Sequence, residues 1–465
     1  MADEYDVAVI GGGPAGTSAA LRAAGLGARV VLLEASDRFG GTCVNTGCVP
    51  TRALARAARL MRDIRGARAF GIRVDEPALD WPAAVARVQE RVEAVRDSKS
   101  DEQRLVDAGV TIVREGLARF EDAHTIAVAS GRRVSATSTI ICVGGHSRLL
   151  PIPGAELALV PEHLLTVPAL PDRVAIIGGG NTGTQVATIL DSFGVDVSLF
   201  DVAPRILMTS DAGVAEAITA EYTTHGITVR TGIAGVDGLE QTDDGAIALT
   251  WRDGDDTRTE SFGAVIMATG WPGAIADIGL EDAGVEVSGS YIPVDGDFRT
   301  SASHIFAVGD VNGQSMLVQA ARFEAEAAAE NAVLGVDHRT PHHLLPVGAF
   351  TDPDFAGVGL TEEEARERMP DCLVAVAQYS DLERALIDDR AVGFLKLICD
   401  SRRSLIVGAH AVGENAVEVI QAVTTAMAAG IDVATLAKVK FAYPTYSAVI
   451  GNAARLLLDD AAESG

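Results

Sequence analysis

The stretch that decides the fold is residues 5–10 (YDVAVI), followed directly by residues 11–16 (GGGPAG). The first six form a short apolar run typical of a buried strand. The next six fit G-x-G-x-x-G, a pattern that lets backbone approach a pyrophosphate at the start of a helix. A helix is expected through about Leu26, then a strand over Ala28–Leu33 that ends at Glu34, a candidate ribose ligand. Together these features predict a dinucleotide site built from Gly11, Gly13, Gly16 and Glu34.

A second unit repeats this order. Val174–Ile177 is an apolar run, residues 178–183 read GGGNTG, and a helix to about Phe193 precedes a strand over Val195–Phe200 that ends at Asp201. A carboxylate at this strand end bonds a free ribose and repels a 2′-phosphate, which favours NADH over NADPH, although Arg205 nearby would weaken that preference. The predicted ligands of this second dinucleotide are Gly178, Gly180, Thr182, Gly183 and Asp201.

Residues 40–50 (GGTCVNTGCVP) place two cysteines, Cys43 and Cys48, just after the first unit. On a regular helix, residues five apart have Cα atoms roughly 8–9 Å apart, whereas a disulfide needs less than about 7 Å. A bond between them therefore requires a distorted turn, which Gly47 makes easier. The alternative interpretation is a pair of unlinked core cysteines, as we expect for Cys142 and Cys399.

Composition limits the remaining possibilities. A chain of 465 residues is expected to form two or three domains. Its net charge of −26 argues against binding to nucleic acid or to an anionic membrane surface. Five cysteines are too few for a secreted disulfide scaffold, the acidic N-terminus leads straight into a strand, and no apolar run reaches the ~18 residues of a membrane helix. We therefore expect a soluble, cytoplasmic protein.

The rest of the chain indicates an α/β fold with two Rossmann-like domains and a C-terminal α+β domain. A helix is expected over Trp81–Ala108 and a strand over Val110–Arg119. The strands Ala264–Ala268 and Ile305–Asp310 contain or precede glycines and should return the chain to the first domain. From about Pro341 the pattern changes to alternating strands and helices.

Six motifs occur in a specific order: GGGPAG, GGTCVNTGCVP, IIGGGNTG, ATGWP, IFAVGD and TDPDFAGVGLTEEEA. With them the chain resembles the FAD-dependent pyridine nucleotide–disulfide oxidoreductases over essentially its whole length, a family that includes dihydrolipoamide dehydrogenase and mercuric reductase. The resemblance implies an enzyme that uses FAD and NAD(P)H and dimerises through its C-terminal domain. It also implies an FAD-binding domain at 1–150 and 272–340, an NAD(P)-binding domain at 151–271 and a dimerisation domain at 341–465.

The same resemblance implies roles for individual residues. Cys48 would be the thiol that faces the flavin and Cys43 the exposed interchange thiol. Asp310 would bond the ribityl chain, and Arg52 would stand near flavin N5, where relatives pair a lysine with a glutamate that is Gln185 here. Further positions implied to line the cofactors are Gly41, Thr42, Ala118, Gly144 and Leu317 for FAD and Gly270 for NAD(P).

The C-terminal segment departs from the family pattern. Disulfide-reducing members carry His-Pro-Thr-x-x-Glu, whose histidine acts as the base, but Tyr443 and Ala448 stand at the His and Glu positions here. A phenol with a pKa of about 10 is a poor base at neutral pH, and losing a general base costs ~10²–10⁴-fold. Tyr443 can still donate a hydrogen bond to a carbonyl or quinone oxygen.

These substitutions predict that electrons pass to an acceptor other than a disulfide, namely a quinone, another conjugated carbonyl or a metal ion. One alternative is a disulfide reductase or dithiol oxidase with a different base. Another is a non-catalytic flavoprotein that senses redox state. We predict no resident metal site.

Overall fold

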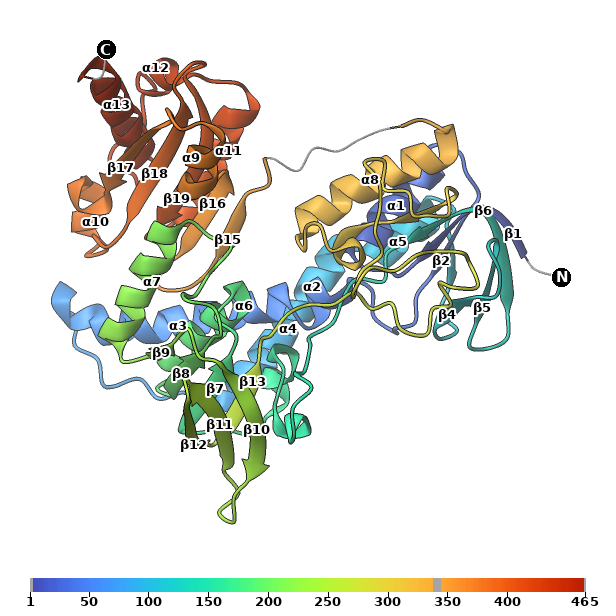
Figure 1. Cartoon of the computed structure of the whole chain (residues 1–465), viewed down its shortest axis with the longest axis horizontal. Helices are drawn as coiled ribbons and strands as arrows, with labels where there is room; N and C mark the ends of the chain where they lie inside the picture. The colour runs from blue at the N-terminus through green and yellow to red at the C-terminus, as the bar shows by residue number, and fades with distance from the viewer. Residues whose placement is uncertain (1–2, 338–343, 464–465) are drawn as a thin grey trace. The chain divides into compact units, whose positions relative to one another are not determined.

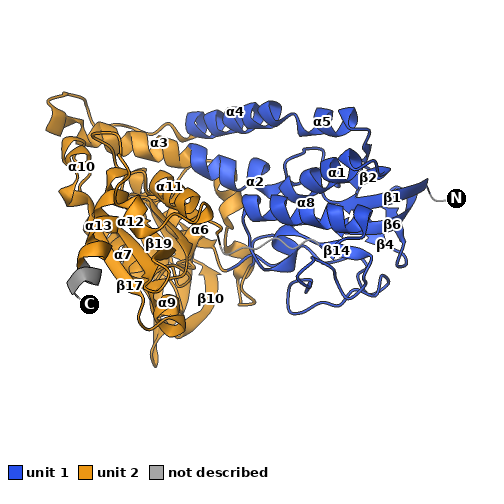
Figure 2. Ribbon diagram, turned by 90° about the horizontal axis from the view of Figure 1, so that it is seen from above, with its two compact units in different colours: residues 1–53, 82–148, 270–342 blue, residues 54–81, 149–269, 343–465 orange. Residues whose placement is uncertain are grey.

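The computed structural model describes residues 3–337 and 344–463, the last four by backbone only. By contacts the chain divides into two compact units (Figure 2), one made of residues 1–53, 82–148 and 270–342, the other of residues 54–81, 149–269 and 343–465. Parallel sheets with helices occur in both units, and an antiparallel sheet with helices ends the second (Figure 1), so the predicted α/β fold class is confirmed. The predicted domain boundary at 340/341 lies outside the described residues.

The first unit is built on a seven-stranded sheet in the order β3-β2-β1-β6-β5-β4, with β14 paired to β6. Its central strands are parallel, whereas β4, β5 and β6 pair antiparallel. The elements are β1 (Asp3–Ile10), α1 (Pro14–Gly25), β2 (Val30–Leu33), α2 (Gly41–Asn45), α5 (Asp101–Asp107), β3 (Thr111–Val113), β4 (Ala118–Phe120), β5 (Thr125–Val128), β6 (Arg133–Ile141), β14 (Ile305–Ala307), η4 (Gly309–Asn312) and α8 (Val318–Leu334). Two further helices, α3 (Cys48–Gly66) and α4 (Trp81–Lys99), contribute residues to both units.

Both faces of the first sheet are buried, as its near-continuous apolar strands require. Val7 and Val9 face a core shared with α1 and α8, and Ala8 and Ile10 face a second core on the opposite side. The buried positions of α1 and α8 are mostly alanines, and such small side chains let two helices lie close together. This packing fixes the end of β1, where the first glycine motif begins.

The second unit contains a four-stranded parallel sheet in the order β13-β7-β8-β9 and a three-stranded antiparallel sheet, β10-β11-β12. Trp251, Phe200 and Phe262 join these two sheets through one buried core. The elements are η1 (Ala67–Phe70), η2 (Ala155–Leu157), η3 (Pro161–Thr166), β7 (Arg173–Ile177), α6 (Asn181–Ser192), β8 (Asp196–Phe200), α7 (Ala212–His225), β9 (Thr228–Arg230), β10 (Gly235–Gln241), β11 (Ile247–Asp253), β12 (Asp256–Phe262) and β13 (Ala264–Met267).

The C-terminal part of this unit is a five-stranded antiparallel sheet in the order β15-β16-β19-β18-β17. Helices α11 and α13 share one buried core with it, centred on residues such as Leu397, Val423 and Ile450. The elements are β15 (Val347–Ala349), β16 (Phe355–Gly359), α9 (Glu362–Arg368), β17 (Leu373–Gln378), η5 (Tyr379–Asp381), α10 (Glu383–Ile387), β18 (Phe394–Asp400), β19 (Leu405–Val412), α11 (Ala416–Ala428), α12 (Val433–Leu436) and α13 (Ala448–Glu463).

Two expected elements were wrong in extent. The predicted helix over Trp81–Ala108 is two helices, because Ser100 takes a left-handed φ of 49° between α4 and α5. The predicted strand over Val110–Arg119 is divided into β3 and β4, with Gly116 at a φ of 94° between them. Periodicity runs through both breaks, which is why the apolar pattern did not reveal them.

Candidate functional site

The first glycine motif forms a tight turn between β1 and α1. Gly11 has a φ of 104°, and a Cβ on Gly16 would lie 1.8 Å from the Gly11 carbonyl oxygen, so both positions require glycine. Gly13 is the N-cap of α1, and no side chain of the described chain caps it. The first N–H groups of α1 are therefore available to an anion.

Glu34 closes this motif from the end of β2. Its Oε2 accepts a hydrogen bond from the Gly12 N–H at 2.6 Å, and its Oε1 accepts one from the Ser36 N–H at 2.7 Å. These two bonds hold the carboxylate beside the glycine turn, where the sequence predicts a ribose ligand.

The second motif has the same construction between β7 and α6. Gly178 has a φ of 109°, and a Cβ on Gly183 would lie 1.9 Å from the Gly178 carbonyl oxygen. Asp201 accepts hydrogen bonds from the N–H groups of Gly179 at 2.6 Å and Ala203 at 2.8 Å. Gly180 and Thr182 lie where α6 begins, so all five predicted residues surround one helix N-terminus.

The two cysteines lie in two consecutive helices. Cys43 is in α2, and Cys48 is the first residue of α3. The helix is interrupted between them, and the Gly47 N–H donates to the Thr42 carbonyl at 2.7 Å. A Cβ on Gly47 would lie 3.1 Å from that oxygen, so glycine permits the close turn that the spacing requires. Both cysteines are free in the structure, with Cys43 half-buried and Cys48 exposed, so Cys43 is not the more exposed thiol that the family resemblance implied.

The electrostatic surroundings shift the pKa values of the two thiols in opposite directions. The hydrogen bond from Cys43 and the charge of Arg52 lower the pKa of Cys48 to about 6, against the opposing effects of burial and Asp310. The same hydrogen bond and burial raise the pKa of Cys43, although the charges of Lys99 and Arg322 act in the opposite direction. Cys48 is therefore the thiolate at neutral pH, and Cys43 keeps the shared proton.

Other predicted FAD residues gather around the first motif to different degrees. A Cβ on Gly41 would lie 2.9 Å from the Gly13 Cα, so the cysteine helix, which continues with Thr42, begins against the glycine turn. Gly144, with a φ of 70°, follows β6. Leu317 is the N-cap of α8, and Ala118 is buried in β4 without a contact that links it to the motif among those described.

Asp310 lies in η4 and has a partner that motif reading missed. The Trp271 indole N–H donates to Asp310 Oδ2 at 2.9 Å. Burial raises the pKa of Asp310, and this hydrogen bond acts against the increase. The two ends of η4 are held by buried Glu324, which accepts from the Gly309 N–H at 2.7 Å and from the Asn312 amide at 2.8 Å.

The remaining predicted residues lie elsewhere. Tyr443 is 78% exposed, and Ala448 begins α13. Gln185, on α6, accepts from the Phe350 N–H at 3.3 Å and donates to the Asn181 carbonyl at 2.7 Å. Gly270, with a φ of 125°, belongs to the first unit, whereas the second motif belongs to the second.

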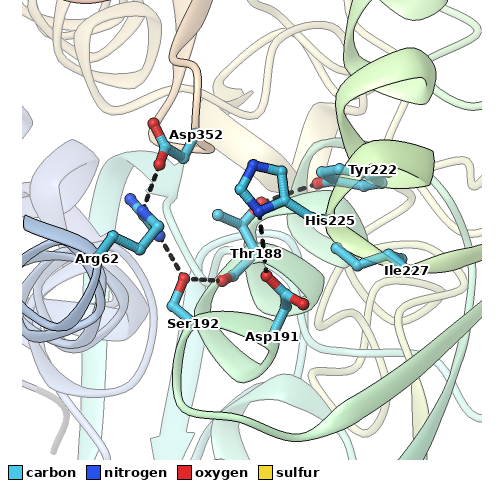
Figure 3. A pocket seen from close by; sticks show the side chains of 8 residues that line it. All are labelled: Arg62, Thr188, Asp191, Ser192, Tyr222, His225, Ile227 and Asp352. Carbon is cyan, nitrogen blue, oxygen red and sulfur yellow. Dashed lines mark hydrogen bonds and ion pairs between the residues drawn. The ribbon is translucent and has the colours of Figure 1, made fainter. Parts of the chain in front are cut away.

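A small cavity within the second unit is unsuitable for an electron acceptor. Its volume is about 10 Å³, close to the space of one water molecule. Figure 3 shows Arg62 reaching both Asp352 and Ser192, with Asp191 and His225 on the opposite side. These charged side chains pair with one another, which is typical of a structural network.

No helix in the described ranges combines the length and apolarity needed to cross a bilayer. The sequence-family model of the pyridine nucleotide-disulphide oxidoreductases matches residues 5–325 of the chain. The family model of their dimerisation domain matches residues 345–454, which supports homodimer formation.

Comparison with individual proteins indicates the same family. The chain is 32% identical to a dihydrolipoyl dehydrogenase of Zymomonas mobilis subsp. mobilis, with 96% of each chain covered. It is 33% identical to that of Thermus scotoductus, with 97% of each covered, and 31% identical to a mercuric reductase of Bacillus cereus, with 95% of this chain and 70% of the reductase covered. The chain therefore belongs to the pyridine nucleotide-disulphide oxidoreductases, enzymes whose members use FAD and NAD(P)H.

Proposed function

We propose that the protein oxidises NADH and passes the two electrons, by way of FAD and the Cys43–Cys48 pair, to a small molecule that is not a disulfide. A quinone, another conjugated carbonyl or an oxidised metal ion are the acceptor classes. NADH loses a hydride and becomes NAD⁺, the acceptor gains two electrons, and any protons it takes up come from solvent. The observation that carries this proposal is an intact Cys43–Cys48 pair in a chain that has the phenol of Tyr443 at the position of the usual imidazole.

The residues around the first glycine motif fit FAD. An open helix N-terminus suits the pyrophosphate, and the fixed Glu34 carboxylate suits a ribose. We assign residues 1–150 and 272–340 to the FAD-binding domain, 151–271 to the NAD(P)-binding domain and 341–465 to the dimerisation domain. When bound, FAD supplies the conversion between hydride transfer and thiol chemistry.

Within the chain, each cysteine has a separate task. The Cys48 thiolate is stabilised beside Arg52, which suits the thiol that stays next to the flavin. Cys43 holds the proton in this proposal. The protein thus stabilises the reduced pair without an imidazole, because the hydrogen bond between the two thiols and the arginine charge provide the stabilisation.

Transfer to a disulfide substrate requires more than this. A thiol must be deprotonated to attack a disulfide, and the leaving thiolate must be protonated. Tyr443 is a poor base at neutral pH, and Ala448 offers no carboxylate to orient it. A quinone or conjugated carbonyl places a lesser demand on the protein, since a hydrogen bond from a phenol to its oxygen is sufficient assistance.

The donor is NADH in this proposal. Asp201 holds a negative charge where a 2′-phosphate would lie. The exposed side chains of the loop that follows, Val202, Pro204, Met208 and Thr209, carry no charge to attract a phosphate. Arg205, which could have done so, donates its hydrogen bonds to backbone carbonyls of its own loop.

The test is a comparison of acceptors under anaerobic conditions. We expect NADH to bleach the flavin of the wild-type protein and to produce a long-wavelength thiolate–flavin absorption band. Turnover with a quinone or metal ion should exceed turnover with lipoamide or glutathione disulfide. Cys43→Ser separates the routes: full activity on the best acceptor would show that electrons leave directly from the flavin, contrary to the proposal.

The relatives named dihydrolipoyl dehydrogenase favour a second candidate, oxidation of a dithiol or reduction of a disulfide with a different base. The double variant Tyr443→His/Ala448→Glu restores the family dyad. We expect it to raise lipoamide turnover by about 10²-fold, the contribution of a general base. Lipoamide turnover that is already high in the wild type and unaltered by this double variant would favour the second candidate.

We also propose a cytoplasmic homodimer. The C-terminal match to the dimerisation domain supports the dimer, and the low cysteine content supports a reducing compartment. Sedimentation of the purified protein and fractionation of the producing cells test the two statements separately.

A further inference from the structure

We infer that Lys99 and Arg322 flank the position of the electron acceptor beside Cys43, and that this acceptor is a quinone or other conjugated carbonyl compound carrying an anionic group, such as a sulfonate or a carboxylate. Lys99 is the last residue of α4, and Arg322 lies in the second turn of α8. The inference rests on the proposed function, in that the acceptor takes its electrons from the Cys43–Cys48 pair. It adds the charge of the acceptor and the two side chains that recognise it.

The end of α4 is bonded directly to the helix that carries Cys43. The Arg96 guanidinium donates to the Asn45 side-chain oxygen at 2.6 Å, and Asn45 lies two residues after Cys43 in α2. Lys99 follows Arg96 by three positions, so the two side chains are neighbours on one face of α4. The face of α4 that contacts α2 therefore extends to Lys99, which is half-buried.

Arg322 approaches the same thiol from α8. In Figure 2, α2 lies between the end of α4 and the beginning of α8, and all three segments belong to the first unit. The hydrogen bond to Cys48 and burial raise the pKa of Cys43, whereas the charges of Lys99 and Arg322 both act to lower it. Charges act on one another appreciably only within about a Debye length, ~10 Å, so both cations lie close to the Cys43 sulfur.

These two cations have no carboxylate partner in the described part of the chain. No ion pair or side-chain hydrogen bond within residues 3–337 and 344–463 involves Lys99 or Arg322. By contrast, Glu93 pairs with both Arg96 and Arg38, which neutralises the nearby charges. Because the chain as a whole has a net charge of −26 and repels anions, two cations without partners beside a redox thiol make a local site that attracts them.

An exposed aromatic side chain next to Arg322 favours a conjugated ring over a metal ion. Phe323 is 57% exposed, and Met316, just before α8, is 40% exposed. An aromatic ring and a thioether offer dispersion contacts to a flat conjugated molecule, whereas a metal ion gains nothing from them. The surroundings of Cys43 therefore combine apolar contact area with positive charge, which suits an aromatic acceptor with an anionic substituent.

The electron transfer balances within the proposed function. The reduced pair, a Cys43 thiol and a Cys48 thiolate, forms the S–S bond and gives up two electrons and one proton. The quinone takes up these two electrons, this proton and one proton from solvent, and becomes a hydroquinone. The anionic substituent takes no part in this step, since its contacts with Lys99 and Arg322 serve only to bind and orient the ring.

The first experiment measures the charge around Cys43 with no acceptor or nicotinamide present. In the FAD-loaded Cys48→Ser protein, residue 43 is alkylated with iodoacetate, which is anionic, and with iodoacetamide, which is neutral. The ratio of the two rates reports the local charge, because both reagents react at the same kind of carbon. We expect Lys99→Gln and Arg322→Gln each to lower this ratio by about threefold, the size of an exposed charge interaction.

The second experiment compares turnover with 1,2-naphthoquinone-4-sulfonate and with 1,2-naphthoquinone, using the FAD-loaded protein and NADH under anaerobic conditions. The ratio of kcat/KM for the two quinones should fall by about threefold in each single variant and by about tenfold in the double variant Lys99→Gln/Arg322→Gln. Added salt should lower the ratio in the wild type and leave it nearly constant in the double variant, because screening acts only on charges that are present.

Arg368→Gln is the matched control, because Arg368 on α9 is exposed like Arg322 and likewise has no ion pair within the residues that the structure describes. Unchanged ratios in both single variants would overturn the inference, and so would an equal loss of turnover with both quinones. Weaker dimerisation in sedimentation with unaltered ratios would show that the cations pair with carboxylates of the partner subunit, which also overturns it. A wild-type protein that reduces neither quinone, although its alkylation ratio responds to both variants, would contradict the proposed function itself.

Discussion

The two glycine motifs have nearly the same geometry but different surroundings. Gly11 and Gly178 have φ values of 104° and 109°, and the N-cap residues Gly13 and Gly180 have φ values of −75° and −77°. In each motif, a carboxylate at the next strand end accepts from the second glycine N–H at 2.6 Å. The chain therefore contains the same glycine-motif geometry twice.

The segments that contact the two glycine motifs differ. The first motif meets the start of the cysteine helix, because Gly41 lies against Gly13. The second meets the loop of residues 202–210, because the Leu207 N–H donates to the Gly179 carbonyl, and Arg205 donates to carbonyls within that loop. We therefore propose that the glycine pattern supplies the dinucleotide site in both cases, and that the neighbouring segment decides whether the bound dinucleotide exchanges electrons with thiols or is selected for its ribose.

The largest expected effect separates the two motifs. Gly16→Ala and Gly183→Ala place a Cβ within 2 Å of a carbonyl oxygen, at 1.8 and 1.9 Å, which backbone must move to relieve. We expect Gly16→Ala to abolish FAD retention, and Gly183→Ala to keep FAD but lose reduction by NADH by about 100-fold or more, since a displaced positioning group costs about that much. Flavin absorbance after gel filtration and stopped-flow reduction measure the two effects.

Gly25→Ala is the control for substitution itself, because a Cβ there meets nothing within 4 Å. Loss of FAD from Gly183→Ala with normal FAD in Gly16→Ala would reverse the assignment of the two motifs.

The next effect tests the thiol side of the comparison. Cys43→Ala removes the hydrogen bond that contributes most to lowering the pKa of Cys48 to about 6. A hydrogen bond to a charged group is worth about 1.5–3 kcal/mol, so the pKa should rise by about one to two units. The thiolate in the wild type persists down to about pH 6 and is lost below it, and the variant should lose it at a higher pH. Alkylation rate against pH measures this shift, with Cys48→Ser identifying the signal.

An unchanged titration midpoint in Cys43→Ala would mean that Arg52 alone stabilises the thiolate. Arg52→Met would then shift the midpoint by the whole amount.

Sequence reasoning was strongest where geometry follows from residue type. The glycine motifs, their terminal acids and the interrupted turn at Gly47 follow from sterics that few residues satisfy. The breaks at Ser100 and Gly116 were not foreseen, because a single left-handed residue does not disturb apolar periodicity. The contact of Trp271 with Asp310 was also missed, since the residues are 39 positions apart and neither side chain predicts the other.

A smaller effect tests the selection of the ribose. Asp201→Asn removes the charge but keeps an oxygen that can accept from the Gly179 N–H. We expect the ratio of NADH to NADPH affinity to fall by about tenfold, or ~1.4 kcal/mol, mostly through better NADPH binding. Equilibrium titration with both nucleotides measures the ratio. The matching change Glu34→Gln at the first motif should leave this ratio unaltered, and a change there would mean that the two sites are not separate.

The smallest expected effect concerns how each site is completed. The second motif is completed by the loop that follows it, whereas the predicted FAD residue Asp310 comes from a distant part of the chain and is held by Trp271. Trp271→Phe keeps the ring but removes the N–H, so Asp310 loses a donor and its already raised pKa should rise further. FAD should then bind about three- to tenfold more weakly, part of the 1.5–3 kcal/mol of such a bond being recovered through water. Because a protonated Asp310 is a poorer acceptor, the weakening should grow as pH falls. Release of FAD followed by fluorescence as the pH is lowered from neutrality measures it. An equal loss of NADH affinity would show that Trp271 supports the whole fold and not the first site.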